Sequence, residues 1–241
     1  YDRAVYTKLA DVYFRQGNLQ EALTQLNDLA THYEERQDLD KALETLEYGL
    51  RLAPSNVALN DRYANMLIRR GFLDKGVEHL MRVADLQRKA NQLKDAVKSL
   101  QRAADIHWTL SQHDKAQEVY DKILHIAPND IEARQWLSFM HTLAFRTADA
   151  IAEKKQIARI FAKQRDYDSA IAELHQIIAL DQKDLEAYYM WGDMLMRREE
   201  YGQAVQLYNR MLKMEGVEIP RLEALRAAAS RMLQLQQATR N

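Results

Sequence analysis

The segment YYMWGDMLMRREEYGQAVQLY, from Tyr188 to Tyr208, contains the pattern that decides the fold. Its small residues Gly192 and Ala204 are twelve positions apart, and large apolar side chains recur around each of them at helical spacing. Two antiparallel helices joined by a short turn approach closely only where the facing side chains are small, so hairpin geometry fixes this spacing. The segment therefore predicts a pair of packed antiparallel helices.

The same spacing of small residues recurs along the chain, which indicates an internal structural repeat. The pairs are Ala10 and Ala22, Ala30 and Ala42, Ala64 and Gly76, Ala84 and Ala96, Ala104 and Ala116, Ser138 and Ala150, Ala158 and Ala170, and Gly192 and Ala204. Only seven Gly and three Pro occur in 241 residues, too few for the many turns of a β-rich or α/β fold. The chain is therefore predicted to be all-α.

This arrangement resembles the tetratricopeptide repeat (TPR), a 34-residue helical hairpin with small and aromatic residues at fixed positions. The best copy consists of Tyr188, Trp191, Gly192, Leu195, Ala204 and Tyr208, and another copy ends with Ala116, Tyr120 and Pro128. The resemblance covers about residues 3–216. It implies a right-handed α-solenoid of stacked antiparallel helix hairpins.

The copies do not follow one another at a constant interval. Three 34-residue steps, such as that from Ala42 to Gly76, are mixed with four 20-residue steps, such as that from Ala22 to Ala42. Each alanine that begins a 34-residue step is followed, twelve residues later, by Pro54, Pro128 or the polar turn at 181–183. The helix that contains this alanine should therefore be short. Helices that begin 20-residue steps have no such stop at the equivalent positions, which are Glu34, Arg88, Trp108 and Ala162. We expect these longer helices to pack in two hairpins each, one with the preceding helix and one with the following helix.

These rules predict about thirteen helices in a single domain that spans residues 1–241, because such repeats bury their apolar faces by stacking on their neighbours. The expected helices are 3–16, 19–36, 39–53, 57–70, 73–90, 93–111, 114–127, 131–145, 148–164, 167–181, 184–198, 201–215 and 219–238. Polar residues after Pro54 and Pro128 are expected to start helices, and Gly17 and Gly71 are expected to end them.

The last predicted helix, about 219–238, is amphipathic. Its apolar face is expected to contain Leu222, Leu225, Ala229, Met232 and Leu233, with Arg221, Arg226 and Arg231 on or near the other face. A basic amphipathic helix could lie on a membrane surface or on a partner. A repeat array needs a polar-faced terminal element, so a capping helix is the favoured interpretation.

The sequence contains no pattern typical of an enzyme, a cofactor site or a metal site. It has no cysteine, which excludes thiolate zinc sites and thiol nucleophiles. Its seven histidines include no pair three or four positions apart that could hold a metal from one helix face. Asp121 and His125 are one turn apart, but such a pair is usually an ordinary contact on a helix surface. The prediction is a protein without catalytic residues, cofactor or metal.

The resemblance also implies where a partner would bind. In the family, the first helix of each hairpin lines a concave surface, and residues one turn either side of the small residue contact the ligand. The matching positions here are Asp61, Asn65, Arg69, Gln135, Phe139, Tyr189, Asp193 and Arg197. Exposed aromatic side chains at Phe139 or Tyr189 would be the best anchors, with an ordinary solvated face as the alternative.

One known mode of binding in the family does not fit this sequence. Some members hold the C-terminal carboxylate of chaperone peptides with Lys and Asn one turn apart. Here Asn65 is preceded by Asp61 rather than by Lys, and Thr7 and Asp11 also depart from the pattern. Binding of chaperone tails in that manner is not expected.

Charge and hydropathy limit the remaining classes of partner. The formal net charge is −1, which gives no global reason to bind nucleic acid. The longest apolar runs, such as 177–180, fall far short of the roughly 20 residues that span a bilayer. The chain begins without Met and is expected to be a fragment, with the cytoplasm as the default compartment. Its oligomeric state is left open.

The leading hypothesis is a scaffold that binds a protein or peptide partner on a concave helical surface. The alternative is a sensor or dimerisation module of a larger regulatory protein, which the full reading frame would distinguish by an attached effector domain. A nucleic-acid-binding array is a third hypothesis, and it predicts salt-dependent binding to RNA or DNA.

Overall fold

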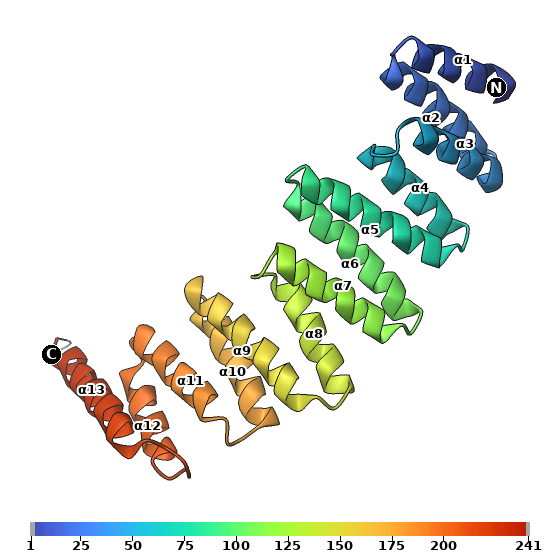
Figure 1. The fold of residues 1–241 in the computed structure, drawn as a ribbon. Coiled ribbons are helices and arrows are strands. Elements are labelled where there is room, and N and C mark those ends of the chain that lie inside the picture. Colours follow the sequence, from blue (N-terminus) through green and yellow to red (C-terminus); the bar gives the residue numbers. More distant parts are fainter. Residues whose placement is uncertain (1–2, 240–241) are drawn as a thin grey trace. The chain divides into compact units, whose positions relative to one another are not determined.

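A computed structural model describes residues 3–239, which contain thirteen α-helices and no strand (Figure 1). The helices are α1 (Arg3–Arg15), α2 (Leu19–Glu35), α3 (Leu39–Leu52), α4 (Val57–Arg69), α5 (Leu73–Lys89), α6 (Leu93–Thr109), α7 (His113–Ile126), α8 (Ile131–Leu143), α9 (Thr147–Lys163), α10 (Tyr167–Leu180), α11 (Leu185–Arg197), α12 (Tyr201–Met211) and α13 (Ile219–Ala238). The predictions of an all-α fold and of thirteen helices are confirmed for these residues.

Contacts between residues divide the chain into two compact units. We call residues 1–128, with α1 to α7, the N-terminal unit, and residues 129–241, with α8 to α13, the C-terminal unit. Within each unit, every helix packs against the next helix along the chain. The single domain expected for residues 1–241 remains a prediction.

The small residues of the repeat lie where successive helices cross. All sixteen members of the eight pairs are buried. At the pair in α8 and α9, the Ser138 hydroxyl donates a hydrogen bond to the Ala150 carbonyl, 3.2 Å away. A Cβ atom on Gly76 would lie 2.6 Å from Cγ1 of Ile68. The spacing of the small residues therefore reflects close helix packing, as the sequence predicts.

Helix lengths follow the two kinds of step in the sequence. The helices that begin 20-residue steps, α2, α5, α6 and α9, each contain 17 residues. Those that begin 34-residue steps, α3, α7 and α10, each contain 14 residues. Each longer helix packs against the helix before it and the helix after it. The predicted sharing of one helix between two hairpins is confirmed.

The ends of the helices show the expected capping. The side chains of Asn56 and Asp130 accept hydrogen bonds from the backbone N–H groups of the third residue beyond them, at 2.9 and 2.8 Å. In all eight hairpins, the residue seven positions after the first small residue has a positive φ angle. These residues are Gly17, Gln37, Gly71, Asn91, Ser111, Phe145, Arg165 and Glu199. The tight turns therefore require a left-handed residue at one fixed position.

The largest error in the predicted boundaries is at the end of α12. This helix ends at Met211 rather than at residue 215, because the chain turns there and reaches Gly216, whose φ angle is 79°. The predicted helix 131–145 ends at Leu143 for a similar reason, since Phe145 has a φ angle of 56°.

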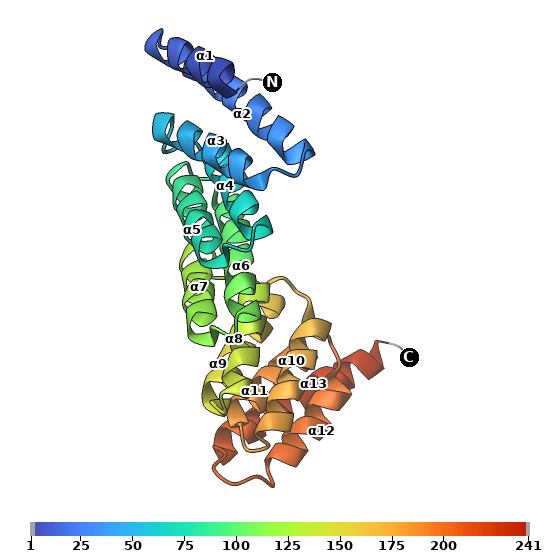
Figure 2. The same ribbon diagram turned by 90° about the vertical axis from the view of Figure 1, so that its right-hand side faces the viewer.

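Alternate helices also meet through their side chains, which places them in two layers within each unit. In the N-terminal unit, Arg3 of α1 pairs with Glu44 of α3 at 2.7 Å, and Arg62 of α4 pairs with Glu34 of α2 at 2.7 Å. Figure 2 shows α5 and α7 on one side of this unit and α4 and α6 on the other. The core between the layers includes the fully buried Tyr120.

In the C-terminal unit, α9, α11 and α13 form one layer. Lys155 of α9 pairs with Glu186 of α11 at 2.6 Å, and the Arg221 guanidinium of α13 lies 4.7 Å from the centre of the Tyr189 ring of α11. Tyr188 and Tyr208 fill the core of this unit and are each 1% exposed. The last helix buries Leu222 and Ala229 of its predicted apolar face, whereas Met232 remains 39% exposed.

Candidate protein-binding site

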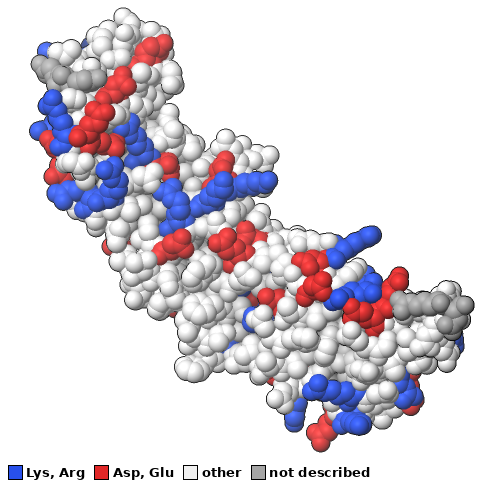
Figure 3. Space-filling model, turned by 180° about the vertical axis from the view of Figure 1, so that it is seen from behind, with Lys and Arg blue, Asp and Glu red and all other residues white. Residues whose placement is uncertain are grey.

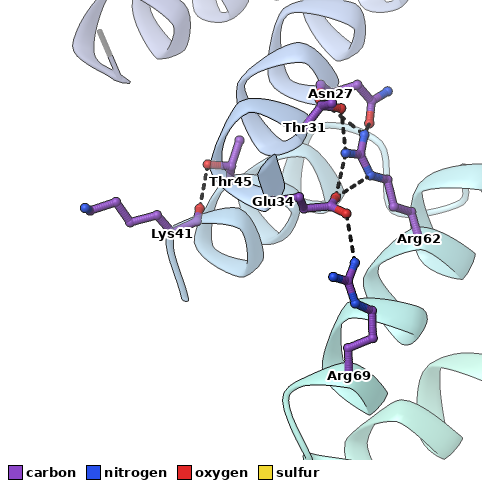
Figure 4. Close-up of polar contacts among 7 residues, drawn as sticks. All are labelled: Asn27, Thr31, Glu34, Lys41, Thr45, Arg62 and Arg69. Atoms are coloured by element: carbon purple, nitrogen blue, oxygen red, sulfur yellow. Dashed lines mark hydrogen bonds and ion pairs between the residues drawn. The ribbon is translucent and has the colours of Figure 1, made fainter. Parts of the chain in front are cut away.

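The predicted site residues of the N-terminal unit lie on α4, beside a polar network that the sequence did not reveal. Arg62 of α4 donates hydrogen bonds to the Asn27 backbone oxygen at 3.2 Å and to the Asn27 side chain at 3.0 Å. It also donates to the Thr31 hydroxyl at 2.8 Å and to Glu34 at 2.7 Å. Figure 4 shows the guanidinium directed at three successive turns of α2. Arg62 therefore fastens α4 to α2.

Each predicted residue on α4 already has a partner inside the unit. Arg69 donates to the second oxygen of Glu34 at 3.1 Å (Figure 4). Asp61 pairs with Arg102 of α6 at 2.7 Å, and Asn65 accepts a hydrogen bond from the same guanidinium. The Asn65 amide also donates to Asp61 at 3.1 Å. A ligand at this surface would have to displace these contacts, which join α2, α4 and α6.

One face of the N-terminal unit carries a mixture of basic and acidic side chains (Figure 3). On the face shown in Figure 3, basic and acidic side chains of this part of the molecule lie next to one another. Neighbouring opposite charges partly cancel one another's electric field at a distance.

In the C-terminal unit, Gln135 and Phe139 lie on α8. They line a shallow hollow of about 360 Å³ together with Glu132 and Trp136. The Phe139 ring is 46% exposed and meets Trp136 edge-on, with 5.8 Å between ring centres. Phe139 therefore meets the condition of exposure set for an anchor, and a binding role for it remains a prediction.

The remaining predicted residues lie on α11, where the structure brings two of them to a larger hollow. Tyr189 and Asp193 line a hollow of about 630 Å³ between α9, α11 and α13. Its apolar lining consists of Ala162, Leu185, Met190 and Met194, together with the Tyr189 ring. Arg197 is not among the lining residues, but it donates a hydrogen bond to Asp193 at 2.8 Å. This hydrogen bond raises the pKa of Arg197.

Acidic groups at this hollow are already neutralised by neighbouring cations. Glu186 pairs with Lys155 at 2.6 Å and with Arg159, and Lys155 pairs also with Asp184 at 2.8 Å. Burial lowers the pKa of Lys155, but the hydrogen bonds to Asp184 and Glu186 outweigh this effect and raise it. Asp193 is held by Arg197, so neither acid of the lining is without a counter-ion.

Two cations at the rim of the hollow lack a carboxylate closer than 4.0 Å. Lys163 is exposed and forms no ion pair within the described part of the chain. Arg221 lies over the Tyr189 ring, and its nearest carboxylate oxygen belongs to Glu218 at 4.0 Å. The Tyr189 hydroxyl is buried and has no hydrogen-bond partner among residues 3–239. The hollow therefore combines an apolar lining with an excess of positive charge among its charged lining residues.

Sequence reasoning identified Tyr189 and Asp193 but missed Lys163 and Arg221. The two cations are distant from Tyr189 in the sequence, one before it and one after it, on the helices that flank α11 in its layer. A prediction that α9 and α13 flank α11 in one layer, combined with the exposed polar positions of these two helices, could have identified both cations.

Comparison with known families agrees with the architecture. Models of the tetratricopeptide repeat match residues 4–35, 97–130 and 155–215, which together make up more than half of the chain. The chain belongs to the tetratricopeptide-repeat family. Repeats of this family generally act as protein-interaction scaffolds.

Solved structures of similar fold have low sequence identity to this chain. The TPR domain of P58(IPK) is 14% identical, with 97% of this chain and 80% of that chain covered and a TM-score of 0.39. MamA from Desulfovibrio magneticus RS-1 is 14% identical, with 80% and 94% covered and a TM-score of 0.36. The TPR2AB domain of yeast Sti1, solved as a complex with an HSP90 peptide, is 15% identical, with 83% and 95% covered and a TM-score of 0.33.

Comparison with curated protein sequences gives no match. None of the helices within residues 3–239 is long and apolar enough to cross a membrane.

Proposed function

We propose that this chain is a protein-interaction scaffold and that the hollow between α9, α11 and α13 receives a segment of a protein partner. The observation that carries the proposal is the position of Tyr189 and Asp193, predicted from the repeat, at a hollow of about 630 Å³. An apolar lining with a few polar groups at its rim is typical of binding sites.

The chemistry of the hollow favours a particular kind of segment. An apolar side chain of the partner would contact Met190 and Met194, and would remove apolar surface from water on both sides. A carboxylate next to it in the partner would pair with Lys163 or Arg221, the cations that lack a close counter-ion. The proposed ligand is therefore an extended segment with an apolar anchor beside acidic residues.

Three pools of fluorescent ten-residue peptides would test this proposal. All have a fixed central Leu, and the flanking positions hold Asp and Glu, neutral polar residues, or Lys and Arg. We expect the acidic pool to bind most tightly and to lose at least tenfold in affinity against a protein carrying Lys163→Glu and Arg221→Glu. Because binding of the acidic pool depends on charge pairs at the rim, its affinity for the unchanged protein should also fall at high salt.

The control protein carries Lys183→Glu and Lys213→Glu, which reverse two exposed charges of the same unit outside the lining of the hollow. This control should bind the acidic pool as the unchanged protein does. The proposal is wrong if no pool binds saturably, or if the rim variant and the control lose affinity equally.

A further inference from the structure

A second groove lies in the N-terminal unit, in the layer formed by α5 and α7. It consists of two adjoining hollows of about 670 and 360 Å³, both lined by Met81 and Lys122. The walls are α5 and α7, and His107 and Leu100 of α6 contribute to the floor. None of these residues belongs to the surface predicted from the repeat.

The walls of this groove are straight because their residues recur at helical spacing. The α5 residues are Asp74, Val77, Glu78, Met81, Ala84, Asp85 and Arg88, and the α7 residues are Lys115, Glu118, Val119, Lys122, His125 and Ile126. Residues three and four apart lie on one face of a helix, so each set forms one stripe. The α5 stripe extends over about 21 Å at a rise of 1.5 Å per residue. The groove is therefore several helical turns long.

The middle of the groove is apolar. Met81 lines both hollows and is only partly buried, and it lies between the buried side chains of Val77 and Ala84 on the same wall. On α7, Ile126 lines the groove and is only partly buried, whereas Val119 is 3% exposed. An apolar stripe of a partner could therefore bury surface against both walls at once.

The edges of the groove carry opposite charges. The α5 wall carries Asp74, Glu78 and Asp85, and the α7 wall carries Lys115 and Lys122. No ion pair joins the two walls among the described residues, and Asp74, Glu78, Lys115 and Lys122 take part in no ion pair there.

Two residues depart from this division of charge. Arg88 lies on the acidic wall, where it pairs with Asp85 of the same helix at 3.7 Å. Glu118 lies on the basic wall, between Lys115 and Lys122 in the stripe. The net charge of the lining acids and bases is still negative on α5 and positive on α7.

We propose that the α5–α7 groove is a docking site for an amphipathic helix of a protein partner. The helix would place an apolar stripe on Met81, basic residues along the α5 wall and acidic residues along the α7 wall. Insertion of an amphipathic helix into a groove is a recurrent mode of recognition, and neighbouring helix axes pack about 8–10 Å apart. The opposite charges of the walls select this helix over a uniformly basic or acidic one. This proposal does not depend on the hollow at Tyr189.

Three synthetic helical peptides would test the groove, each of about 15 residues because shorter isolated helices are only marginally stable in water. All carry the same Leu residues at alternating spacings of three and four. One has Lys on one flank and Glu on the other, one has Lys on both flanks, and one has Glu on both. Fluorescence anisotropy should show at least tenfold tighter binding of the mixed peptide. A protein with Lys115→Glu and Lys122→Glu makes both walls acidic and should instead prefer the all-Lys peptide.

A protein with Lys89→Glu and Lys94→Glu has the same change in net charge at exposed positions outside the groove. It should keep the preference for the mixed peptide. Far-ultraviolet circular dichroism would establish that all three proteins are equally helical. The proposal is overturned if the three peptides bind equally or not at all, or if the Lys115 and Lys122 variant keeps the original preference.

Discussion

A Cβ atom on Gly192 of α11 would lie 2.5 Å from the Cε1 atom of Tyr208 on α12. The phenol ring cannot easily move aside, because Tyr208 is 1% exposed and is surrounded by the core of the C-terminal unit. Glycine at this position is therefore required by the approach of two helices. Gly192 lies inside a helix, where glycine is otherwise less favourable than alanine.

Gly192→Ala should destabilise the C-terminal unit by about 1–3 kcal/mol, the usual cost of forcing extra atoms into a packed core. This loss should appear even though alanine favours a helix over glycine by about 1 kcal/mol. Gly202→Ala is the matched control, because a Cβ atom there meets nothing within 4 Å. Urea denaturation of both variants checks the prediction, and similar midpoints would contradict it.

Replacing Arg62 with leucine should destabilise the N-terminal unit by about 1–3 kcal/mol, since the partly buried Glu34 and Asn27 would lose the hydrogen bonds that Arg62 donates to them. Arg62→Lys should not restore the loss, because an ammonium group cannot reach several acceptors as a planar guanidinium does. Arg69→Leu should cost no more than about 1 kcal/mol, since its side chain is 50% exposed and makes one of these contacts. Equal losses for Arg62→Leu and Arg69→Leu in urea denaturation would show that the network has no special role.

The N-terminal unit should lose stability as the pH falls below about 6.5, the ordinary pKa of histidine. Burial, followed by the nearby Arg82, lowers the pKa of His79, whose Nδ1 atom is buried without a hydrogen-bond partner in the described range. The unfolded chain therefore binds a proton at His79 more readily than the folded chain does. The contribution of neutral His79 to stability is complete above the unfolded pKa and is lost as the pH falls through the folded pKa. Urea midpoints at pH 7.5 and pH 5 measure the effect.

His79→Gln should reduce this dependence on pH, because glutamine takes up no proton in that range. The comparison with the unchanged protein isolates His79 from His32, whose pKa is also lowered and which both proteins retain. An unchanged difference between the two midpoints would exclude His79 as its source.

The turns at positive φ give opposite predictions for two substitutions. Arg165→Gly should leave the stability of the C-terminal unit unchanged or raise it by up to about 1 kcal/mol, since glycine adopts its φ angle of 63° without strain. Gly71→Ala should lower the stability of the N-terminal unit by about 1 kcal/mol, because Gly71 has a φ angle of 87°. Thermal denaturation measures both effects, and a gain for Gly71→Ala would refute the assignment of these turns.

The fold could be predicted from the sequence because its information is local. Gly192 and Ala204 lie within one hairpin, and the requirement for small residues at their contact acts over twelve positions. Pro54 and Pro128 likewise stop helices in their own vicinity. The predicted end of α12, residue 215 instead of Met211, was wrong because no proline marks the turn before Pro220.

The candidate site was less predictable, since side chains from distant helices complete it. Asp61 and Asn65 occupy ligand-contacting positions of the repeat, but Arg102, which lies two helices further along the chain, already binds both. Lys163 and Arg221 meet at the hollow beside Tyr189 only because α9 and α13 flank α11. Helical periodicity predicts the face of the helix on which a residue lies. It does not predict which long side chain of another helix contacts that residue.

The helices shared by two hairpins have a consequence for how such an array can evolve. A 34-residue step adds two helices, so every later helix keeps its layer, whereas a 20-residue step adds only one. Gain or loss of a single 20-residue step would therefore transpose all later helices of that unit to the opposite layer. One short duplication could turn an outward face inward, and bring a new set of side chains to a partner, without changing any of the residues themselves.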